Sequence, residues 1–149
     1  MSRKCILYIA CSVDGFIAGP EDDLSFLDKM GKQDYGYEAF LKTVDSMIVG
    51  RKTYEWVKGK LGYFPTHDLE TFVITRSLKG KEDNVVFSDE TPTSLVKSLK
   101  QQEGENIFCN GGGMIVQDLL KGRQIDEFIL AIVPHLLGSG TPLFATGLP

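Results

Sequence analysis

Three consecutive glycines, Gly111-Gly112-Gly113, are the residues whose type and spacing most clearly suggest chemistry. Residues 106–110 before them are apolar enough for a short buried strand, and 114–121 repeat apolar residues four positions apart, which predicts an amphipathic helix. A strand that runs through bare backbone into a helix N-terminus offers N–H groups to an anion such as a phosphate. The alternative interpretation is a tight turn that needs positive φ.

Two other predicted strand ends carry basic and hydroxyl side chains. Gly50-Arg51-Lys52-Thr53 follows the apolar residues 47–49, and its charges together with a new helix N-terminus suit a phosphate. Thr75-Arg76-Ser77 follows 72–74 and suits a monoester phosphate, such as the 2′-phosphate that distinguishes NADP from NAD. Taken singly, the first could be a solvated basic turn and the second an ordinary polar strand end.

Strand patterns alternate with helix patterns along the chain, which predicts a three-layer α/β fold with a mostly parallel central sheet and helices on both faces. Ligands of such sheets bind at the carboxyl ends of the strands, so the three polar ends should meet at one edge. Strands are expected at 4–11, 16–18, 46–50, 71–75, 84–87, 106–110 and 125–133, and helices near 24–30, 36–44, 51–57, 91–99 and 114–121.

Together the three ends predict a site for a phosphate-rich dinucleotide. The glycines lack G-x-G-x-x-G spacing, and no acidic residue follows about 20 positions later, which disfavours a Rossmann site. Two arginines and the absence of an evident ribose-binding carboxylate favour NADPH over NADH.

Composition limits the class of protein. The 149 residues suit a single domain, 1–149, and a net charge of −4 with interspersed signs gives no indication of nucleic-acid or membrane binding. The three cysteines lie in or beside apolar strands and are expected to be buried and reduced, so we expect a cytoplasmic protein. His67 and His135 have no partner at ligand spacing, so no metal site is expected.

These motifs resemble the dihydrofolate reductase superfamily in order and spacing. The matching segments are Ser12–Ala18, Met47–Glu55, Phe72–Ser77 and Gly111–Gly113. Residues 125–130, together with Leu136-Leu137-Gly138-Ser139-Gly140 and 142–144, resemble more narrowly the branch that holds the reductase domain of riboflavin-biosynthesis enzymes and small stand-alone bacterial reductase-like proteins. The resemblance implies a dihydrofolate reductase-like fold with NADPH bound across the strand ends, and a cis peptide between Gly111 and Gly112.

Carried over position by position, the resemblance implies a set of cofactor contacts. It assigns phosphate binding to Gly50, Arg51, Lys52 and Thr53, and the adenosine side with its 2′-phosphate to Thr75, Arg76 and Ser77. It assigns the pyrophosphate and nicotinamide to Gly111, Gly112, Gly113, Met114 and Ile115, and further nicotinamide contacts to Ala10 and Ile17.

The substrate side is less constrained. The stretch Asp23-Leu24-Ser25-Phe26 resembles the acidic first helix of folate reductases, which makes Asp23 the candidate catalytic residue; its alternative role is a helix N-cap. Asp14 is expected to shape a turn with Gly15. A flat-ring pocket could be walled by Tyr8, Phe26, Leu27 and Trp56, whose alternative is ordinary core.

The expected function is NADPH-dependent hydride transfer to a pteridine- or pyrimidine-like small molecule, related to the riboflavin-biosynthesis uracil reductase. The alternatives are a non-catalytic binding protein on the same fold and a true dihydrofolate reductase, which the segment 136–140 disfavours. The riboflavin step itself is disfavoured because few residues could hold a ribose phosphate. The resemblance implies a homodimer, an inference weakened because the chain stops at Pro149, before the final strand of relatives.

Overall fold

The computed structural model describes residues 3–30 and 36–144. The strands are β1 (Cys5–Ser12), β2 (Phe16–Ala18), β3 (Val44–Gly50), β4 (Glu70–Ile74), β5 (Gly80–Glu82), β6 (Val85–Ser88), β7 (Asn106–Gly111), β8 (Glu127–Val133) and β9 (Thr141–Pro142). The α-helices are α1 (Tyr37–Leu41), α2 (Arg51–Leu61), α3 (Pro92–Lys100) and α4 (Gly113–Lys121), and two 3-10 helices, η1 (Pro20–Asp22) and η2 (Ser25–Met30), follow β2.

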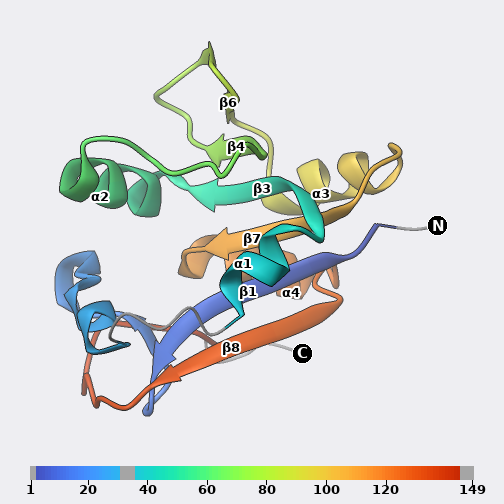
Figure 1. Ribbon diagram of the computed structural model, residues 1–149. Coiled ribbons are helices and arrows are strands. Elements are labelled where there is room, and N and C mark those ends of the chain that lie inside the picture. The colour runs from blue at the N-terminus through green and yellow to red at the C-terminus, as the bar shows by residue number, and fades with distance from the viewer. Residues whose placement is uncertain (1–2, 31–35, 145–149) are drawn as a thin grey trace.

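Seven strands form one twisted sheet in the order β5-β6-β4-β3-β7-β1-β8 (Figure 1). Every neighbouring pair in it is parallel except β5 and β6, and β2 pairs with β9 in a separate antiparallel ribbon. Helices lie on both faces. The predicted three-layer α/β fold with a mostly parallel sheet is therefore confirmed.

Alternation along the central strands explains why both faces are covered. On β3, Met47 packs beneath α1 and Val49 packs with Tyr54 of α2, whereas Ile48 points to the opposite core. That opposite core includes Val96 of α3 and further apolar residues of α4. Because a strand sends successive side chains to opposite faces, an apolar run such as 47–49 needs cover on both faces of the sheet.

The structure corrects two elements. The helix expected over 36–44 ends at Leu41, and Val44 begins β3, where it is buried. The hydroxyl of Thr43 donates to the carbonyl oxygen of Phe40 at 2.7 Å, so a turn interrupts the helix before the apolar spacing ends. Strand β5 was not predicted, because its residues are exposed and only pairing with β6 makes it a strand.

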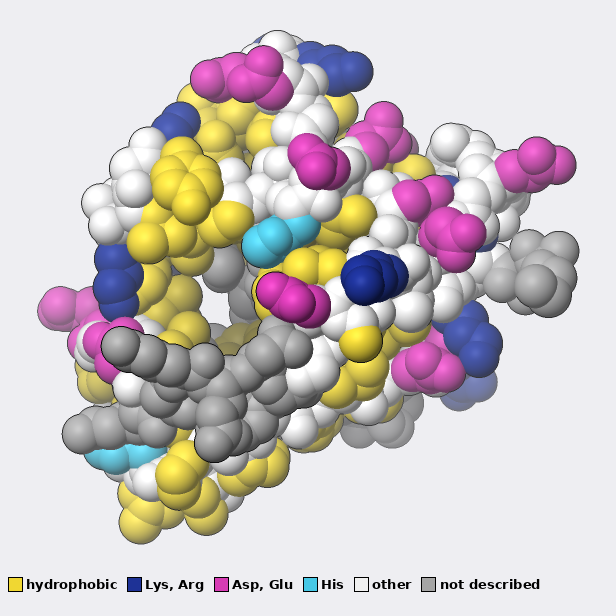
Figure 2. Space-filling model, in the orientation of Figure 1, with side chains coloured by type: hydrophobic (Ala, Val, Ile, Leu, Met, Phe, Trp, Pro, Cys, Tyr) yellow, Lys and Arg dark blue, Asp and Glu magenta, His cyan; other side chains and the backbone are white. Residues whose placement is uncertain are grey.

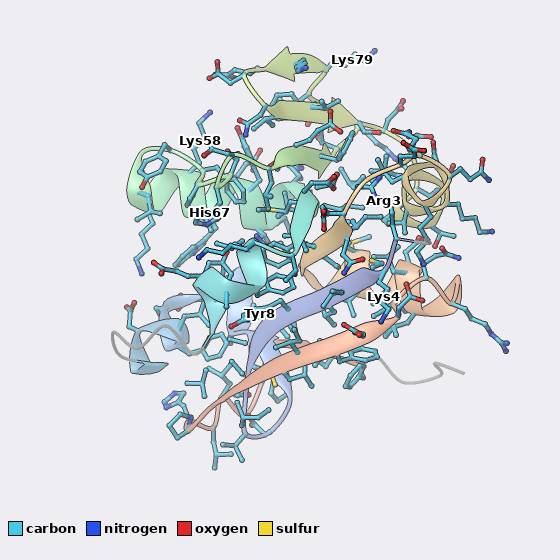
Figure 3. All side chains as sticks on the ribbon, turned by 45° about the vertical axis from the view of Figure 1, so that its right-hand side comes forward. Arg3, Lys4, Tyr8, Lys58, His67 and Lys79 are labelled. Carbon is cyan, nitrogen blue, oxygen red and sulfur yellow. The ribbon has the colours of Figure 1, made fainter. Side chains whose placement is uncertain are left out.

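A buried ion pair ties together the amino ends of three central strands. Arg3, just before β1, donates to Asp45 Oδ1 at 2.6 Å, to Ser46 Oγ at 3.0 Å and to the carbonyl oxygen of Glu105 at 2.6 Å. Its fourth acceptor is the carbonyl oxygen of Leu99, at 2.8 Å. Figure 3 shows Arg3 at the amino end of β1, with Tyr8 farther along that strand. This network sets the register of β1, β3 and β7 from the end opposite to the polar strand ends.

Two kinds of feature are absent within the described residues. None of the helices there is both long enough and apolar enough to span a bilayer. In the same part of the chain, no group of three or more His, Cys, Asp or Glu side chains is placed to hold a metal ion.

Candidate active site

One cavity of about 1240 Å³ lies at the carboxyl ends of β1, β3, β4 and β7. The space-filling view shows the molecule hollowed on one side, with hydrophobic side chains around the hollow (Figure 2). Pockets for one drug-sized ligand measure roughly 300–1,000 Å³, so this volume leaves room for a dinucleotide and a second small molecule. The strand ends that the sequence marked as polar all border it.

The glycine turn forms the floor of the cavity. The Gly111–Gly112 peptide is cis, as the resemblance implied, and α4 begins at Gly113 without a side-chain cap. A Cβ on Gly113 would lie 2.8 Å from Thr141 Cγ2, and one on Gly112 would lie 3.2 Å from Thr53 Oγ1. The absence of side chains at Gly112 and Gly113 allows α2 and β9 to pack closely against this turn. It also leaves main-chain N–H groups at the N-terminus of α4 open to an anion.

The N-terminus of α2 contributes the second anion-binding element. Gly50 is extended and provides no side-chain cap, and Arg51, Lys52 and Thr53 all line the cavity. Arg51 also forms an exposed ion pair with Glu55, at 3.5 Å between Nη1 and Oε1. An exposed i,i+4 pair of this kind contributes only about 0.3–0.5 kcal/mol, so it can yield to a phosphate.

The end of β4 contributes the third element. Thr75 is buried, and its hydroxyl oxygen accepts a hydrogen bond from the backbone N–H of Ser77 at 3.2 Å. This side-chain turn places the exposed Arg76 between two hydroxyl groups at the rim of the cavity. A guanidinium with flanking hydroxyls can bind a phosphate monoester.

Acidic residues near Arg76 were missed in the sequence. Asp89 and Glu90 follow β6, whose Ser88 pairs with Ile74 of β4, and both line the cavity. Only the register of β4 on β6 places them at the same edge of the cavity as the end of β4. A third acidic lining residue, Asp118, is already engaged by Thr93, whose N–H and hydroxyl donate to Oδ1 at 2.9 and 2.7 Å.

Around the glycine turn, the structure brings together the remaining predicted cofactor residues. Every residue predicted to contact the cofactor lines the cavity, except that Gly111 lies just behind its cis-bonded neighbour Gly112. The others are Ala10, Ile17, Gly50, Arg51, Lys52, Thr53, Thr75, Arg76, Ser77, Gly112, Gly113, Met114 and Ile115. Met114 is 80% exposed, so its side chain is accessible to a ligand in the cavity that it lines.

Asp14 links the turn that follows β1 to the loop at residues 137–138. Its carboxylate accepts hydrogen bonds from the N–H groups of Leu137 and Gly138, at 3.1 and 2.8 Å, and from Ser12 Oγ at 2.5 Å. The Ser12 hydroxyl and these N–H groups lower the pKa of Asp14 to about 2. Asp14 thus ties the turn after β1 to residues 137–138, a longer-range role than the local turn predicted.

Two of the four residues predicted for the substrate side line the cavity. Tyr8 and Leu27 line the cavity, whereas Phe26 is buried in the interior and is not part of the lining. Trp56 also lies outside the lining, and its ring packs under Lys60, with Nζ 5.0 Å from the ring centroid. The period of a helix fixes which residues share a face but not which face meets the cavity.

Three lining residues on this side, Tyr37, Phe108 and Asn110, were missed. Phe108 and Asn110 were interpreted only as part of a buried strand, and Tyr37 only as one residue of an apolar helical stripe. The one available indication was Asn110 itself, a polar side chain at the end of an otherwise apolar strand, directly before the glycines.

Asp23, the candidate catalytic residue, is exposed and lies outside the cavity lining. Its Oδ1 accepts a hydrogen bond from the backbone N–H of Ser25 at 2.9 Å. That bond, with a further one from the Ser25 hydroxyl, lowers the pKa of Asp23 below its ordinary value. A carboxylate that is outside the cavity and ionised at neutral pH is poorly suited to protonate a substrate, and its bond to the N–H two residues on forms a local turn just before η2.

The fold and site together define a dihydrofolate reductase-like α/β protein. Within that class, residues 3–148 match the model of the RibD C-terminal domain, and the chain belongs to this family. Curated relatives include the uncharacterized protein YwjB of Bacillus subtilis (strain 168), 44% identical over 97% of this chain and 84% of YwjB. The uncharacterized protein YyaP of the same organism is 27% identical over 95% of this chain and 80% of YyaP.

Solved structures confirm the fold. A Shewanella sp. PV-4 protein, provisionally assigned to riboflavin biosynthesis, is 30% identical, with a TM-score of 0.81 over 97% of this chain and 84% of that one. A diaminohydroxyphosphoribosylaminopyrimidine deaminase/5-amino-6-(5-phosphoribosylamino)uracil reductase from Thermotoga maritima has a TM-score of 0.67 at 15% identity, over 99% of this chain and 51% of that one. Dihydrofolate reductase from Enterococcus faecalis, complexed with NADP(H) and RAB-propyl, has a TM-score of 0.68 at 14% identity, over 99% of this chain and 82% of that one.

Proposed function

We propose that this protein is an NADPH-dependent reductase that transfers a hydride to a flat, pteridine- or pyrimidine-like ring. The single observation that carries the proposal is the cavity, in which three phosphate-suited strand ends are continuous with a compartment walled by aromatic rings. Two proteins with the same fold have names that fit it, the Thermotoga maritima uracil reductase and the Enterococcus faecalis enzyme complexed with NADP(H).

The residues present fit a reduced nicotinamide dinucleotide. The N-termini of α2 and α4, with Arg51 and Lys52, would hold the pyrophosphate, and Arg76 would hold the 2′-phosphate. Bound there, the cofactor would supply a hydride to a ring carbon of the substrate, and a proton would be added to the adjacent ring nitrogen. The chain would contribute by holding the two rings face to face and excluding water.

Cofactor binding tests the proposal directly. Isothermal titration calorimetry should detect NADPH with a dissociation constant well below about 1 mM, the level at which binding is worth only some 4 kcal/mol. Failure of both NADPH and NADH to bind in that range would refute the reductase function.

The variant Arg76→Ala tests which part of the cofactor is recognised. Hydrogen bonds to charged groups contribute about 1.5–3 kcal/mol, so NADPH should bind at least about tenfold more weakly while NADH changes little. Lys97→Ala, which removes an exposed cation of α3 outside the cavity, is the control and should leave both affinities unchanged. Equal losses for NADPH and NADH in Arg76→Ala would show that Arg76 does not contact the 2′-phosphate.

A binding protein without turnover is the second candidate, and the placement of Asp23 outside the cavity favours it. The assay is NADPH oxidation, followed by absorbance, with dihydrofolate and with a ribosylaminopyrimidine as oxidants. Reduction of either ring supports the enzyme, and faster reduction of dihydrofolate would indicate a true dihydrofolate reductase. Tight NADPH binding with no reduction of any ring that also binds would favour the binding protein.

We also propose that the chain forms a homodimer through β8. Among the described residues, this strand pairs only with β1, and its side chains Phe128, Ile129, Leu130 and Ile132 are 37–58% exposed. An edge strand that is apolar on both faces is normally covered by a partner. Light scattering after size exclusion should give twice the mass of one chain for the wild type. For Ile132→Asp it should give the mass of a single chain. Leu61→Asp, at an exposed apolar site on α2, should remain dimeric.

A further inference from the structure

The substrate side of the cavity is a compartment of three aromatic rings. The ring centroid of Tyr8 lies 5.3 Å from that of Tyr37 and 6.2 Å from that of Phe108, and those of Tyr37 and Phe108 are 6.1 Å apart. All three line the cavity, from β1, α1 and β7 respectively. Tyr8 and Tyr37 are partly exposed and offer a surface on which a flat molecule can stack, whereas Phe108 is 1% exposed and packs edge-on behind Tyr37.

One amide is aimed into this compartment by an irregularity of β7. The pairing of β3 with β7 steps from Ile48↔Cys109 to Val49↔Gly111, so Asn110 is an extra, bulged residue. Bulges beside active sites redirect side chains, and the side chain of Asn110 lies on the face of Met47 and lines the cavity. It directly precedes the Gly111–Gly112 peptide beside which the nicotinamide is proposed to bind.

The amide of Asn110 is weakly engaged by the protein. Its Nδ2 donates to Met47 Sδ at 3.5 Å, and a thioether sulfur is a weak acceptor. Among the described residues, no protein hydrogen bond to its Oδ1 is found. A carboxamide that offers one donor and one acceptor side by side matches a ring edge that carries a carbonyl next to an N–H.

The compartment also has a hydroxyl that remains neutral. Tyr37 Oη lies 3.3 Å from His67 Nε2, and the two rings meet edge to face at 5.5 Å. Burial, with a smaller effect of nearby Tyr8, raises the pKa of Tyr37 to about 12, so it keeps its proton at neutral pH. Figure 3 shows His67 on the segment that leads from α2 towards β4.

Charge is distributed unevenly around the cavity. The described charged residues of its lining follow β3, β4 and β6 or lie on α4, and they are Arg51, Lys52, Arg76, Asp89, Glu90 and Asp118. The described lining residues from β1, η2, α1 and β7 are all uncharged. Among the described residues of that part, a phosphate would find no cation to offset its lost hydration, which is costly.

We propose that the compartment binds an uncharged, flat heterocycle without a phosphate group, and that Asn110 recognises its amide-like edge. This inference rests on the proposed function, because the basic strand ends are taken to be occupied by the cofactor. The proposed ligand distinguishes this chain from a reductase whose substrate carries a phosphoribosyl group. The name of the Thermotoga maritima enzyme includes such a group.

The test uses calorimetry on the NADP⁺-saturated protein, with probes that differ by one phosphate. The probes are 5-amino-6-(ribitylamino)uracil, its 5′-phosphate, and 6-methylpterin as a second uncharged ring. At least one uncharged ring should bind, and the phosphate ester should bind at least about tenfold more weakly than its uncharged counterpart. The inference is overturned if neither uncharged ring binds at millimolar concentration, or if the ester binds as tightly as its counterpart or more tightly.

The variant Asn110→Asp keeps the shape of the side chain but removes its donor. It should weaken binding of the uncharged ring at least about tenfold, because a ring carbonyl would then face a carboxylate. Asn106→Asp makes the same change on the same strand outside the cavity, where Oδ1 still accepts from the N–H of Lys4, and should bind the ring as the wild type does. Equal affinity in wild type and Asn110→Asp would overturn the role of Asn110.

NADPH affinity, measured in parallel, separates this inference from the proposed function. If NADPH fails to bind the wild type, the proposed function is wrong and the inference falls with it. If NADPH binds normally to Asn110→Asp while the ring does not, the loss belongs to the substrate compartment rather than to misfolding. If NADPH binds but the phosphate ester is preferred, the proposed function stands and the inference alone is wrong.

Discussion

Removing the carboxylate of Asp45 should destabilise the fold without changing the cavity. The guanidinium of Arg3 is only 4% exposed, and Asp45 Oδ1, at 2.6 Å, is its charged partner. Asp45 Oδ2 also accepts the backbone N–H of Glu105 at 2.9 Å. The substitution Asp45→Ala therefore leaves a buried cation with neutral acceptors only, and frees an N–H group at the start of β7.

The magnitude follows from these partners. Loss of one partner of a fully buried pair costs about 3–5 kcal/mol, but the side chain of Asp45 is 42% exposed, so water can replace part of what it supplies. Arg3 also retains its three other acceptors. We therefore expect Asp45→Ala to lower the free energy of unfolding by about 2–3 kcal/mol, or the melting temperature by roughly 5–10 °C for a chain of this size.

The dependence on pH has a definite sign. Burial opposes ionisation of Asp45, but the N–H of Glu105, the Ser46 hydroxyl and Arg3 together outweigh it and lower the pKa of Asp45. A carboxyl whose pKa is lowered in the folded state stabilises the fold above its unfolded pKa, about 3.9, and this contribution is lost as the pH falls through the folded value. The stability difference between wild type and Asp45→Asn should therefore shrink on acidification below about pH 4.

Urea unfolding followed by circular dichroism, at neutral and at acidic pH, measures both quantities. Glu103→Ala, an exposed carboxylate in the same loop region, should change stability by no more than about 0.5 kcal/mol. The reasoning is refuted if Asp45→Ala lowers the free energy of unfolding by less than about 1 kcal/mol. It is also refuted if the stability difference between the wild type and Asp45→Asn grows on acidification. NADPH affinity of the folded variant should equal that of the wild type, because the ion pair lies at the opposite ends of the strands from the cavity.

Three further outcomes follow from the site. Gly113→Ala would place its Cβ 2.8 Å from Thr141 Cγ2, so calorimetry should show weaker NADPH binding together with a loss of roughly 1–3 kcal/mol in stability. Asp89→Asn removes an acid near the proposed 2′-phosphate position, so it should tighten NADPH more than NADH; equal changes would place Asp89 elsewhere. Burial raises the pKa of Cys5 to about 12 and that of Cys109 above its ordinary value, so a thiol reagent at pH 8 should modify these cysteines only after unfolding.

The meeting of the three polar strand ends at one cavity could be predicted from sequence because each end is a local motif. Each polar strand end is a few consecutive residues, such as Gly50-Arg51-Lys52-Thr53, that follow an apolar run. In a parallel sheet, the direction of the chain already places every such end at the same edge. The structure then brought Arg51, Arg76 and Gly112 to one cavity without any change in their expected order.

The substrate half could not be predicted in the same way. Which face of a helix meets a cavity depends on how the helix is rotated against the sheet, and this rotation excluded Trp56 and included Tyr37. The bulge at Asn110 depends on a register shift between β3 and β7, which are separated in sequence by α2, β4, β5, β6 and α3. Neither the rotation nor the shift leaves a periodic trace in the sequence.

The sequence by itself determined the order of strands and helices, the apolar central strands and the three phosphate-suited ends, because each depends on residues close together in the chain. Only the tertiary structure decided that Asp23 lies outside the cavity lining, that Asp89 borders the cavity, and that Asn110 lines it beside Phe108. These placements arise from contacts between segments far apart in sequence, whose free energies depend on how the whole sheet and its helices pack.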